Sequence, residues 1–204
     1  MKRSLLTLLT VTSLAGSALA APQTFDFKDA KGVNNAVFKL DAPLEAINGS
    51  ASGISGTVTF DPENPAATRG KIVVASTSLH VPNPMMKEHL HGVQWMDVAK
   101  NPDIIFEAKE LKNVKQQGET VTADVAGALT LRGVCKDVTV PVKITYLKDK
   151  LAARSNGQQK GDLLVIRSTF PIQRADYGIN PKAPSDKVAE QIDITLSIAG
   201  ASPK

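Results

Sequence analysis

The sequence predicts an all-β protein: an antiparallel sheet that closes into a β-barrel of about eight strands, with one short helix. The first observation is an alternation of apolar and polar residues with a period of two, clearest over residues 138–146 and 191–198. This period gives a sheet one apolar and one wet face, which is typical of antiparallel strands. The second is a set of turn-forming clusters between the strands, such as 61–65 and 155–157. Closure then removes exposed sheet edges.

Strands are expected wherever this alternation occurs. The expected ranges are 25–28, 35–40, 54–60, 71–79, 103–111, 121–131, 138–146, 164–172 and 191–198. Residues 48–50, spelled Asn-Gly-Ser, are interpreted as a turn. Pro141 removes one ladder donor, so its strand is expected to lie at an edge or to bulge there. No repeat, linker or change in composition interrupts residues 21–204, which are expected to form one domain.

The same alternation indicates which side chains point into the barrel. These inward candidates are Phe106, Leu129, Val140, Val142, Ile166, Phe170, Val188, Ile192, Ile194 and Leu196. A barrel of about eight strands can be packed solid or can hold one small apolar ligand, and periodicity leaves both open.

The short helix is expected to begin near residue 83 and to end near residue 92. Asn83 is suited to cap the helix, and Pro84 to occupy its first position. Met86, Leu90 and Val93 then share one helical face. Gly92 ends or interrupts the helix.

The first twenty residues have the pattern of a signal peptide. Lys2 and Arg3 precede an apolar stretch over residues 5–15, and small residues at 18 and 20 complete a cleavage pattern. We therefore expect export with cleavage near Ala20. The apolar stretch is too short to span a bilayer.

Composition argues against several other classes of protein. Removal of Lys2 and Arg3 leaves 22 of the 24 basic residues against 20 acidic ones, a formal charge of +2, which is weak support for a nucleic-acid partner. Aromatic residues make up only 4% of the chain, too few for platforms that stack bases. The single cysteine, Cys135, excludes an internal disulfide and a multi-cysteine metal site.

Several stretches along the mature chain resemble, in order, the motifs of one family. They are FDP at 60–62, EHL at 88–90 with WMDV at 95–98, NPDIIF at 101–106, GALTLRGV at 127–134 with VTVPV at 138–142, and IQRADYGI at 172–179. Together they resemble the YceI-like family of exported bacterial proteins, and the resemblance spans nearly all of the mature chain.

The resemblance implies a periplasmic, lipocalin-like barrel that holds an amphiphilic lipid in its lumen and is not an enzyme. The implied ligand is an isoprenoid, a polyprenyl phosphate or an isoprenoid quinone, with no other cofactor. The expected partners are this lipid and, transiently, a membrane surface, but no nucleic acid. The expected ligand-binding residues are Met86, Leu90, Trp95, Phe106, Leu129, Ile166, Phe170, Arg174 and Tyr177.

Arg174 and the methionines have two interpretations each. Arg174 either meets a phosphate or polar lipid head at the barrel mouth, or forms a structural ion pair with Asp176. Met85, Met86, Trp95 and Met96 either line a ligand channel or close the core.

A second hypothesis is a periplasmic enzyme or redox partner that depends on a metal or a thiol. His80, His89 and His91 lie within twelve positions and could ligate zinc or copper. However, His89 and His91 are two positions apart, so they do not share a helix face and cannot ligate one metal ion from the same helix. Cys135 can react as a thiol or pair between two chains, which leaves a homodimer open. As a nucleophile it would need a base nearby, and the favoured interpretation is a buried or half-buried cysteine with no chemical role.

Overall fold

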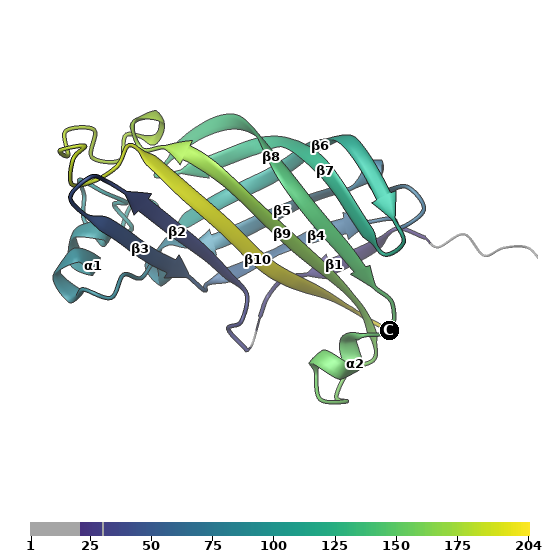
Figure 1. Cartoon of the computed structure of the whole chain (residues 1–204). Helices are drawn as coiled ribbons and strands as arrows, with labels where there is room; N and C mark the ends of the chain where they lie inside the picture. The colour runs from purple at the N-terminus through teal and green to yellow at the C-terminus, as the bar shows by residue number, and fades with distance from the viewer. Residues whose placement is uncertain (1–20, 30) are drawn as a thin grey trace, which may run out of the picture.

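A computed structural model describes residues 21–29 and 31–204. Eight strands form a closed antiparallel ring in the order β1, β4, β5, β6, β7, β8, β9, β10, with β10 pairing back to β1. The ring strands are β1 (Gln23–Asp26), β4 (Ile54–Phe60), β5 (Arg69–Ala75), β6 (Asp103–Gln117), β7 (Thr120–Leu131), β8 (Val134–Leu147), β9 (Gly161–Gln173) and β10 (Gln191–Pro203). Figure 1 shows the long strands wrapping obliquely around the barrel. The predicted antiparallel barrel of about eight strands is confirmed.

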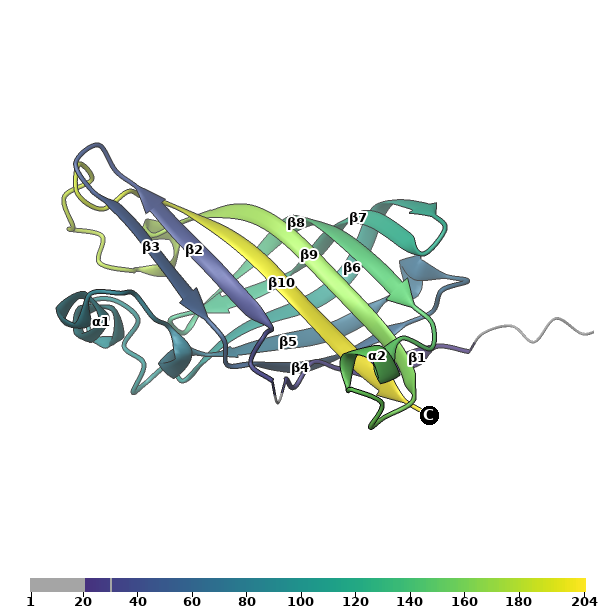
Figure 2. The ribbon, with the colours of Figure 1, turned by 60° about the horizontal axis from the view of Figure 1, so that its bottom comes forward.

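A hairpin outside the ring extends the wall at one end. β2 (Asn35–Asp41) and β3 (Ala46–Ala51) pair with each other, and β2 pairs with β10 from Asp193 to Ser197. Further along, β10 changes partner, and Ala201 pairs with Asp26 of β1. Figure 2 shows the hairpin lying alongside the first half of β10.

The interpretation of residues 48–50 as a turn is wrong, because they lie within β3. Asn48 pairs with Lys39, and Ser50 pairs with Val37. A side chain on Gly49 would collide with the ring of Phe38 and the carbonyl of His80. The glycine therefore permits close approach of the backbone to an aromatic ring rather than a reversal of the chain.

The predicted helix is confirmed as α1 (Pro84–His91), but it is not the only one. The side chain of Asn83 accepts a hydrogen bond from the Met86 N–H (3.1 Å), and Gly92 follows the last turn. A second helix, α2 (Leu151–Arg154), connects β8 to β9. It is a single turn that buries Leu151, which is too short to show a helical period in the sequence. No helix in the described part of the chain is long and apolar enough to cross a membrane.

The sequence also misplaced several strand ends, and two of them have a clear local cause. The strand expected at 71–79 ends at Ala75, where Ser76–Ser78 forms a 3-10 turn and the Ser78 hydroxyl donates to the Ala75 carbonyl (2.7 Å). β6 runs six residues beyond the expected end at Leu111, to Gln117, because bulges between Ala108 and Glu110 and between Lys112 and Lys115 re-register it on β7.

Pro141 lies where β8 begins to pair with β9. The pairing of these strands starts at Val142, so the first part of β8 is bonded only to β7. The Pro141 carbonyl accepts a hydrogen bond from the Ser168 hydroxyl (2.6 Å). The proline thus sits at a local edge, as the missing N–H predicts.

The end of the barrel nearest the C-terminus is closed by aromatic rings and one buried carboxylate. Phe25 and Phe60 pack against the ring of Tyr146. Asp162 is fully buried and accepts hydrogen bonds from the Tyr146 hydroxyl (2.8 Å) and the Asp149 N–H (2.8 Å), with the Lys204 ammonium 3.0 Å away. Burial alone would raise the pKa of Asp162, but these donors together hold it below the ordinary value of 3.8.

Replacing Asp162 tests whether its carboxylate stabilises the closed end of the barrel. We expect Asp162→Asn to reduce the free energy of unfolding by about 2 kcal/mol at neutral pH, because a buried charged acceptor is lost. Since folding lowers the pKa of Asp162, its contribution is complete above pH 3.8 and is lost as the pH falls through the lowered pKa. Urea unfolding at several pH values measures both effects. Asp137→Asn, which removes an exposed carboxylate, should stay close to wild type; equal effects of the two variants would contradict the assignment.

Candidate functional site

A cavity of about 370 Å³ occupies the barrel interior at the end opposite the buried Asp162. Its wall includes exposed residues of the β2–β3 turn and of α1, which places its mouth there. The rings of Phe25, Phe60 and Tyr146 do not line it, because they fill the other end. The cavity is therefore sealed at the base and open at the mouth. Figure 1 shows α1, which lies beside the mouth, at the opposite end of the barrel from the C-terminus.

Alternate positions on consecutive strands build the wall of the cavity. Every inward candidate named from the alternation lies on it: Phe106, Leu129, Val140, Val142, Ile166, Phe170, Val188, Ile192, Ile194 and Leu196. The hairpin adds residues that the sequence analysis did not single out, among them Ala36, Phe38 and Ile47. They were missed because nothing local shows that this hairpin covers the lumen.

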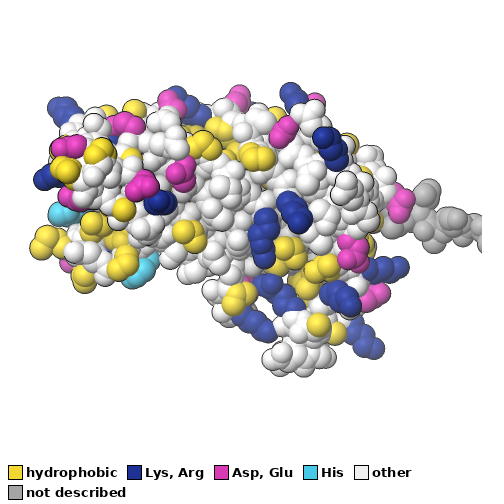
Figure 3. Space-filling view, in the orientation of Figure 1, with side chains coloured by type: hydrophobic (Ala, Val, Ile, Leu, Met, Phe, Trp, Pro, Cys, Tyr) yellow, Lys and Arg dark blue, Asp and Glu magenta, His cyan; other side chains and the backbone are white. Residues whose placement is uncertain are grey.

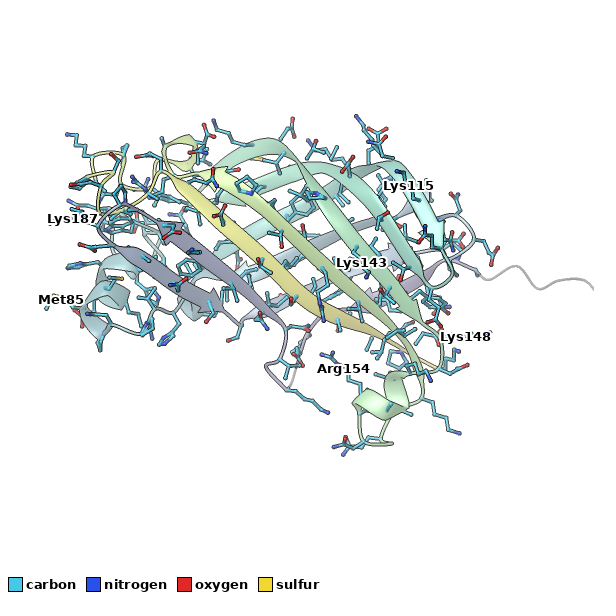
Figure 4. The ribbon with its side chains drawn as sticks, viewed as in Figure 1. Met85, Lys115, Lys143, Lys148, Arg154 and Lys187 are labelled. Carbon is cyan, nitrogen blue, oxygen red and sulfur yellow. The ribbon has the colours of Figure 1, made fainter. Side chains whose placement is uncertain are left out.

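The helix and the segment after it cover part of the mouth. Met86, Leu90, Trp95 and Met96 line the cavity, whereas Met85 is two-thirds exposed and projects from the outer surface (Figure 4). The C-terminal end of α1 is fixed by a hydrogen bond of 2.8 Å between the His91 ring and the Leu79 carbonyl oxygen. Met86 and Met96 therefore face the lumen, whereas Met85 faces outward. Val93 was expected on the helical face of Met86 and Leu90, but it lies beyond the end of α1 and is exposed.

Arg174 lies on the cavity wall with its guanidinium fully buried and fully bonded. Its Nη2 pairs with Glu190 Oε1 at 2.6 Å. The remaining N–H groups donate to the backbone carbonyl oxygens of Ile179, Asn180, Val188 and Ala189. All five donors of the guanidinium are thus used inside the protein. Arg174 holds the loop between β9 and β10 in place.

The ion pair expected between Arg174 and Asp176 does not form. Asp176 pairs instead with Lys136 of β8 at 3.2 Å. Because Arg174 has αR backbone angles and Ala175–Tyr177 forms a 3-10 turn, residues 174 and 176 are not on one face of a strand. Arg174 instead reaches across the loop to Glu190 and places its guanidinium carbon 6.0 Å from the centre of the Trp95 ring.

Tyr177 lies in the core and outside the cavity wall. It is 2% exposed and packs in the main hydrophobic cluster. Burial, followed by the nearby Asp176 carboxylate, raises the pKa of its hydroxyl. The other ligand-binding candidates, from Met86 to Arg174, all line the cavity.

Four further polar side chains line the cavity, and they fall into two pairs. Thr68 and Ser168 donate to the backbone carbonyls of Pro65 and Pro141, both at 2.6 Å. Glu45 in the β2–β3 turn and His89 on α1 are exposed at the mouth, and no hydrogen bond or ion pair within the described chain engages their side chains. The polar groups free to meet a ligand therefore lie at the entrance.

The histidines and the cysteine do not assemble into one site. His80 and His89 are exposed, and His91 faces the Leu79 carbonyl. Cys135 was expected to be buried or half-buried, but it is exposed at the start of β8. Over residues 21–29 and 31–204, no group of three His, Cys, Asp or Glu side chains is placed to hold a metal ion.

A closed eight-stranded barrel with an enclosed apolar lumen defines a protein of the lipocalin-like architectural class. The YceI-like domain model matches residues 25–199, and the chain belongs to that family. Protein YceI of Escherichia coli is 29% identical over 208 residues, covering the full length of both chains.

Solved structures share the fold at low sequence identity. BcnA of Burkholderia cenocepacia is similar with a TM-score of 0.63 and 20% identity, over 81% of this chain and 94% of its own. A polyisoprenoid binding domain of Saccharophagus degradans is similar with a TM-score of 0.63 and 9% identity, over 90% of this chain and 100% of its own.

The assignment of Arg174 as a clamp gives a direct test. We expect Arg174→Lys to lower the free energy of unfolding of lipid-free protein by about 2–3 kcal/mol, because a single ammonium cannot satisfy the backbone carbonyls and Glu190 together. Urea unfolding after delipidation measures this change. Unchanged stability combined with weaker lipid binding would instead make Arg174 a head-group ligand.

Proposed function

We propose that this protein binds an amphiphilic isoprenoid lipid, with the chain inside the barrel and the polar end at the mouth. The observation that carries the proposal is the cavity, which is sealed at one end and lined almost entirely by apolar side chains. Each buried CH₂ of a ligand contributes roughly 0.8 kcal/mol, so a few five-carbon units suffice for useful affinity. The similar domain of Saccharophagus degradans is a polyisoprenoid binding domain, which supports the same class of ligand.

The polar groups at the mouth favour an uncharged head group. Arg174, the cation expected to meet a phosphate, has every donor engaged by the protein. The unengaged side chains are Glu45 and His89, one a carboxylate and the other a weak base. A carboxylate at the entrance repels a phosphate and can accept a hydrogen bond from a hydroxyl group. An isoprenoid alcohol, phenol or quinone therefore fits better than a polyprenyl phosphate.

The proposed role is that of a carrier or store in the periplasm, reached through the signal peptide predicted at residues 1–20, which lie outside the described part of the chain. Membership of the YceI-like family implies a binder rather than a known enzyme. A transient membrane contact would give the lumen access to its lipid. No observation in the described chain favours the metal- or thiol-dependent alternative.

The decisive experiment is native mass spectrometry of the mature protein purified from the periplasm, followed by organic extraction of the bound material. We expect an adduct that is released as an uncharged prenyl lipid. Protein that is free of lipid and takes up neither polyprenols nor isoprenoid quinones would overturn the proposal. Uptake of polyprenyl phosphate alone would keep the lumen as the site but reject the head-group argument.

Filling the lumen should expel ligand. Ala108 lines the cavity, whereas Ala126 is flanked by the buried Val125 and Gly127 and so faces outward. We expect Ala108→Phe to weaken binding of a prenyl lipid at least tenfold, because displacing one five-carbon unit removes on the order of 2–4 kcal/mol of apolar burial. Titration of delipidated protein with a fluorescent prenyl analogue measures this.

Ala126→Phe is the matched control, since it adds the same ring to the outer wall. It should bind the analogue like wild type. Equal affinities for all three proteins would place the ligand outside the lumen.

A further inference from the structure

A row of basic side chains crosses the outer wall of the barrel. Lys115 of β6 pairs with Thr122 of β7, Thr122 pairs with Lys143 of β8, and Lys143 pairs with Arg167 of β9. We refer to Lys115, Thr122, Lys143 and Arg167 as the basic row. All four residues are exposed. The row cannot be recognised in the sequence, because its four residues come from four separate strands.

The row places like charges directly opposite each other. Lys143 and Arg167 are cross-strand partners, and their flanking residues line the lumen, so both side chains leave the same side of the wall. Opposed like charges destabilise a sheet. Among the ion pairs of the described chain, none involves Lys115, Lys143 or Arg167, and Arg167 donates only to backbone carbonyl oxygens. An anion from outside the protein would relieve this repulsion.

A shallow groove runs along the row where β8 starts to pair with β9. Lys115, Lys143 and Arg167 line it together with the hydroxyls of Thr122 and Thr169. The groove also contains Asp124, whose carboxylate accepts a hydrogen bond of 2.7 Å from the Asn113 side chain. Three cations around one engaged carboxylate leave the groove positive. Figure 4 shows Lys115 and Lys143 on the same face.

The positive surface continues toward the sealed base of the barrel. Lys148, Lys150 and Lys160, in the connection from β8 to β9, are exposed, and none belongs to an ion pair within the described chain. Arg154 of α2 is instead engaged by Asp29 at 3.6 Å. Figure 3 shows Lys and Arg side chains gathered over the centre and lower right of this face, and Figure 4 places Lys143, Lys148 and Arg154 there.

We propose that this face docks the barrel on a bilayer that carries anionic phospholipids. The formal charge after removal of the leader is only +2, so the concentration of cations here reflects their placement and not a general excess. Cations spread over a broad wall, with only a shallow groove between them, suit a planar array of phosphates better than a single small anion. Each Lys or Arg at such a surface strengthens binding about fivefold, and salt weakens it.

Docking by this wall lays the barrel on its side. The basic row runs across β6–β9 and the positive surface continues toward the sealed base, so the strands lie along the bilayer and the mouth beside α1 is not pressed into it. The inference concerns where the protein resides. It holds whether or not the lumen carries the proposed lipid.

The test is flotation of the mature protein with vesicles of phosphatidylcholine, alone or mixed with phosphatidylglycerol. We expect binding only to the mixed vesicles, and a marked fall between low and physiological ionic strength. Lys143→Gln with Arg167→Gln removes two such cations and should weaken that binding about 25-fold. Native mass spectrometry of this double variant should show its lumen ligand unchanged, which separates docking from the proposed function.

The matched control is Arg69→Gln with Lys71→Gln, which removes one arginine and one lysine from β5, on the other side of the ring. It should bind the mixed vesicles nearly as well as wild type. If the two double variants lost vesicle binding equally, the binding would depend only on net charge and the proposal would be overturned. Absence of binding to mixed vesicles would overturn it too. So would binding that survives loss of Lys143 and Arg167 but is abolished by Met85→Ser with Val93→Ser at the mouth.

Discussion

The structure depends on how β10 closes the ring. This one strand pairs with β9 along its whole length, with β2 over its first part and with β1 near its end. Because β1 is short, it cannot seal the wall along all of β10, and the β2–β3 hairpin covers what remains. Closure of eight strands sets the interior width at about that of one apolar ligand. The hairpin sets how far the interior extends beyond the ring.

One buried charge stands at each end of the barrel, and only the one at the base belongs to a closed end. At the base, Asp162 collects donors from the Tyr146 hydroxyl, the Asp149 backbone and Lys204, and aromatic rings fill the space. At the mouth, Arg174 collects acceptors from the β9–β10 loop and leaves the interior empty. Buried charges are tolerated only when hydrogen bonding is complete. The side chains of Asp162 and Arg174 therefore both stabilise the fold, and the lumen between them stays apolar.

Sequence patterns predict the features that depend on neighbouring residues. They fail for features that depend on contacts between segments far apart in the chain. All ten inward candidates line the cavity, nine of them on strands, where a period of two fixes which face each residue occupies. Val188 lines it from the loop before β10. The sequence analysis missed β3, whose Asn-Gly-Ser spelling suits a turn until Phe38 packs over Gly49. It paired Arg174 with the nearest carboxylate in sequence, whereas Glu190, sixteen residues away, is the partner in space. The basic row needs the register of four strands, which no window of sequence contains.

Under the proposed function, the size and position of the cavity make its wall responsible for ligand affinity and its mouth responsible for ligand selectivity. At about 370 Å³ it lies near the lower limit of ligand pockets, roughly 300–1,000 Å³, so it encloses only a limited length of chain. A longer ligand must continue through the mouth, past the outer edge of β3. That edge is tied to the neighbouring segment only by the bridge between Ser50 and His80 among the described residues. Under the proposed function, the apolar wall fixes how strongly a lipid chain is held, while Glu45 and His89 meet the part of the ligand that leaves the cavity. The proposed binding site would therefore distinguish ligands with the same chain at the mouth, where the apolar wall ends and solvent begins.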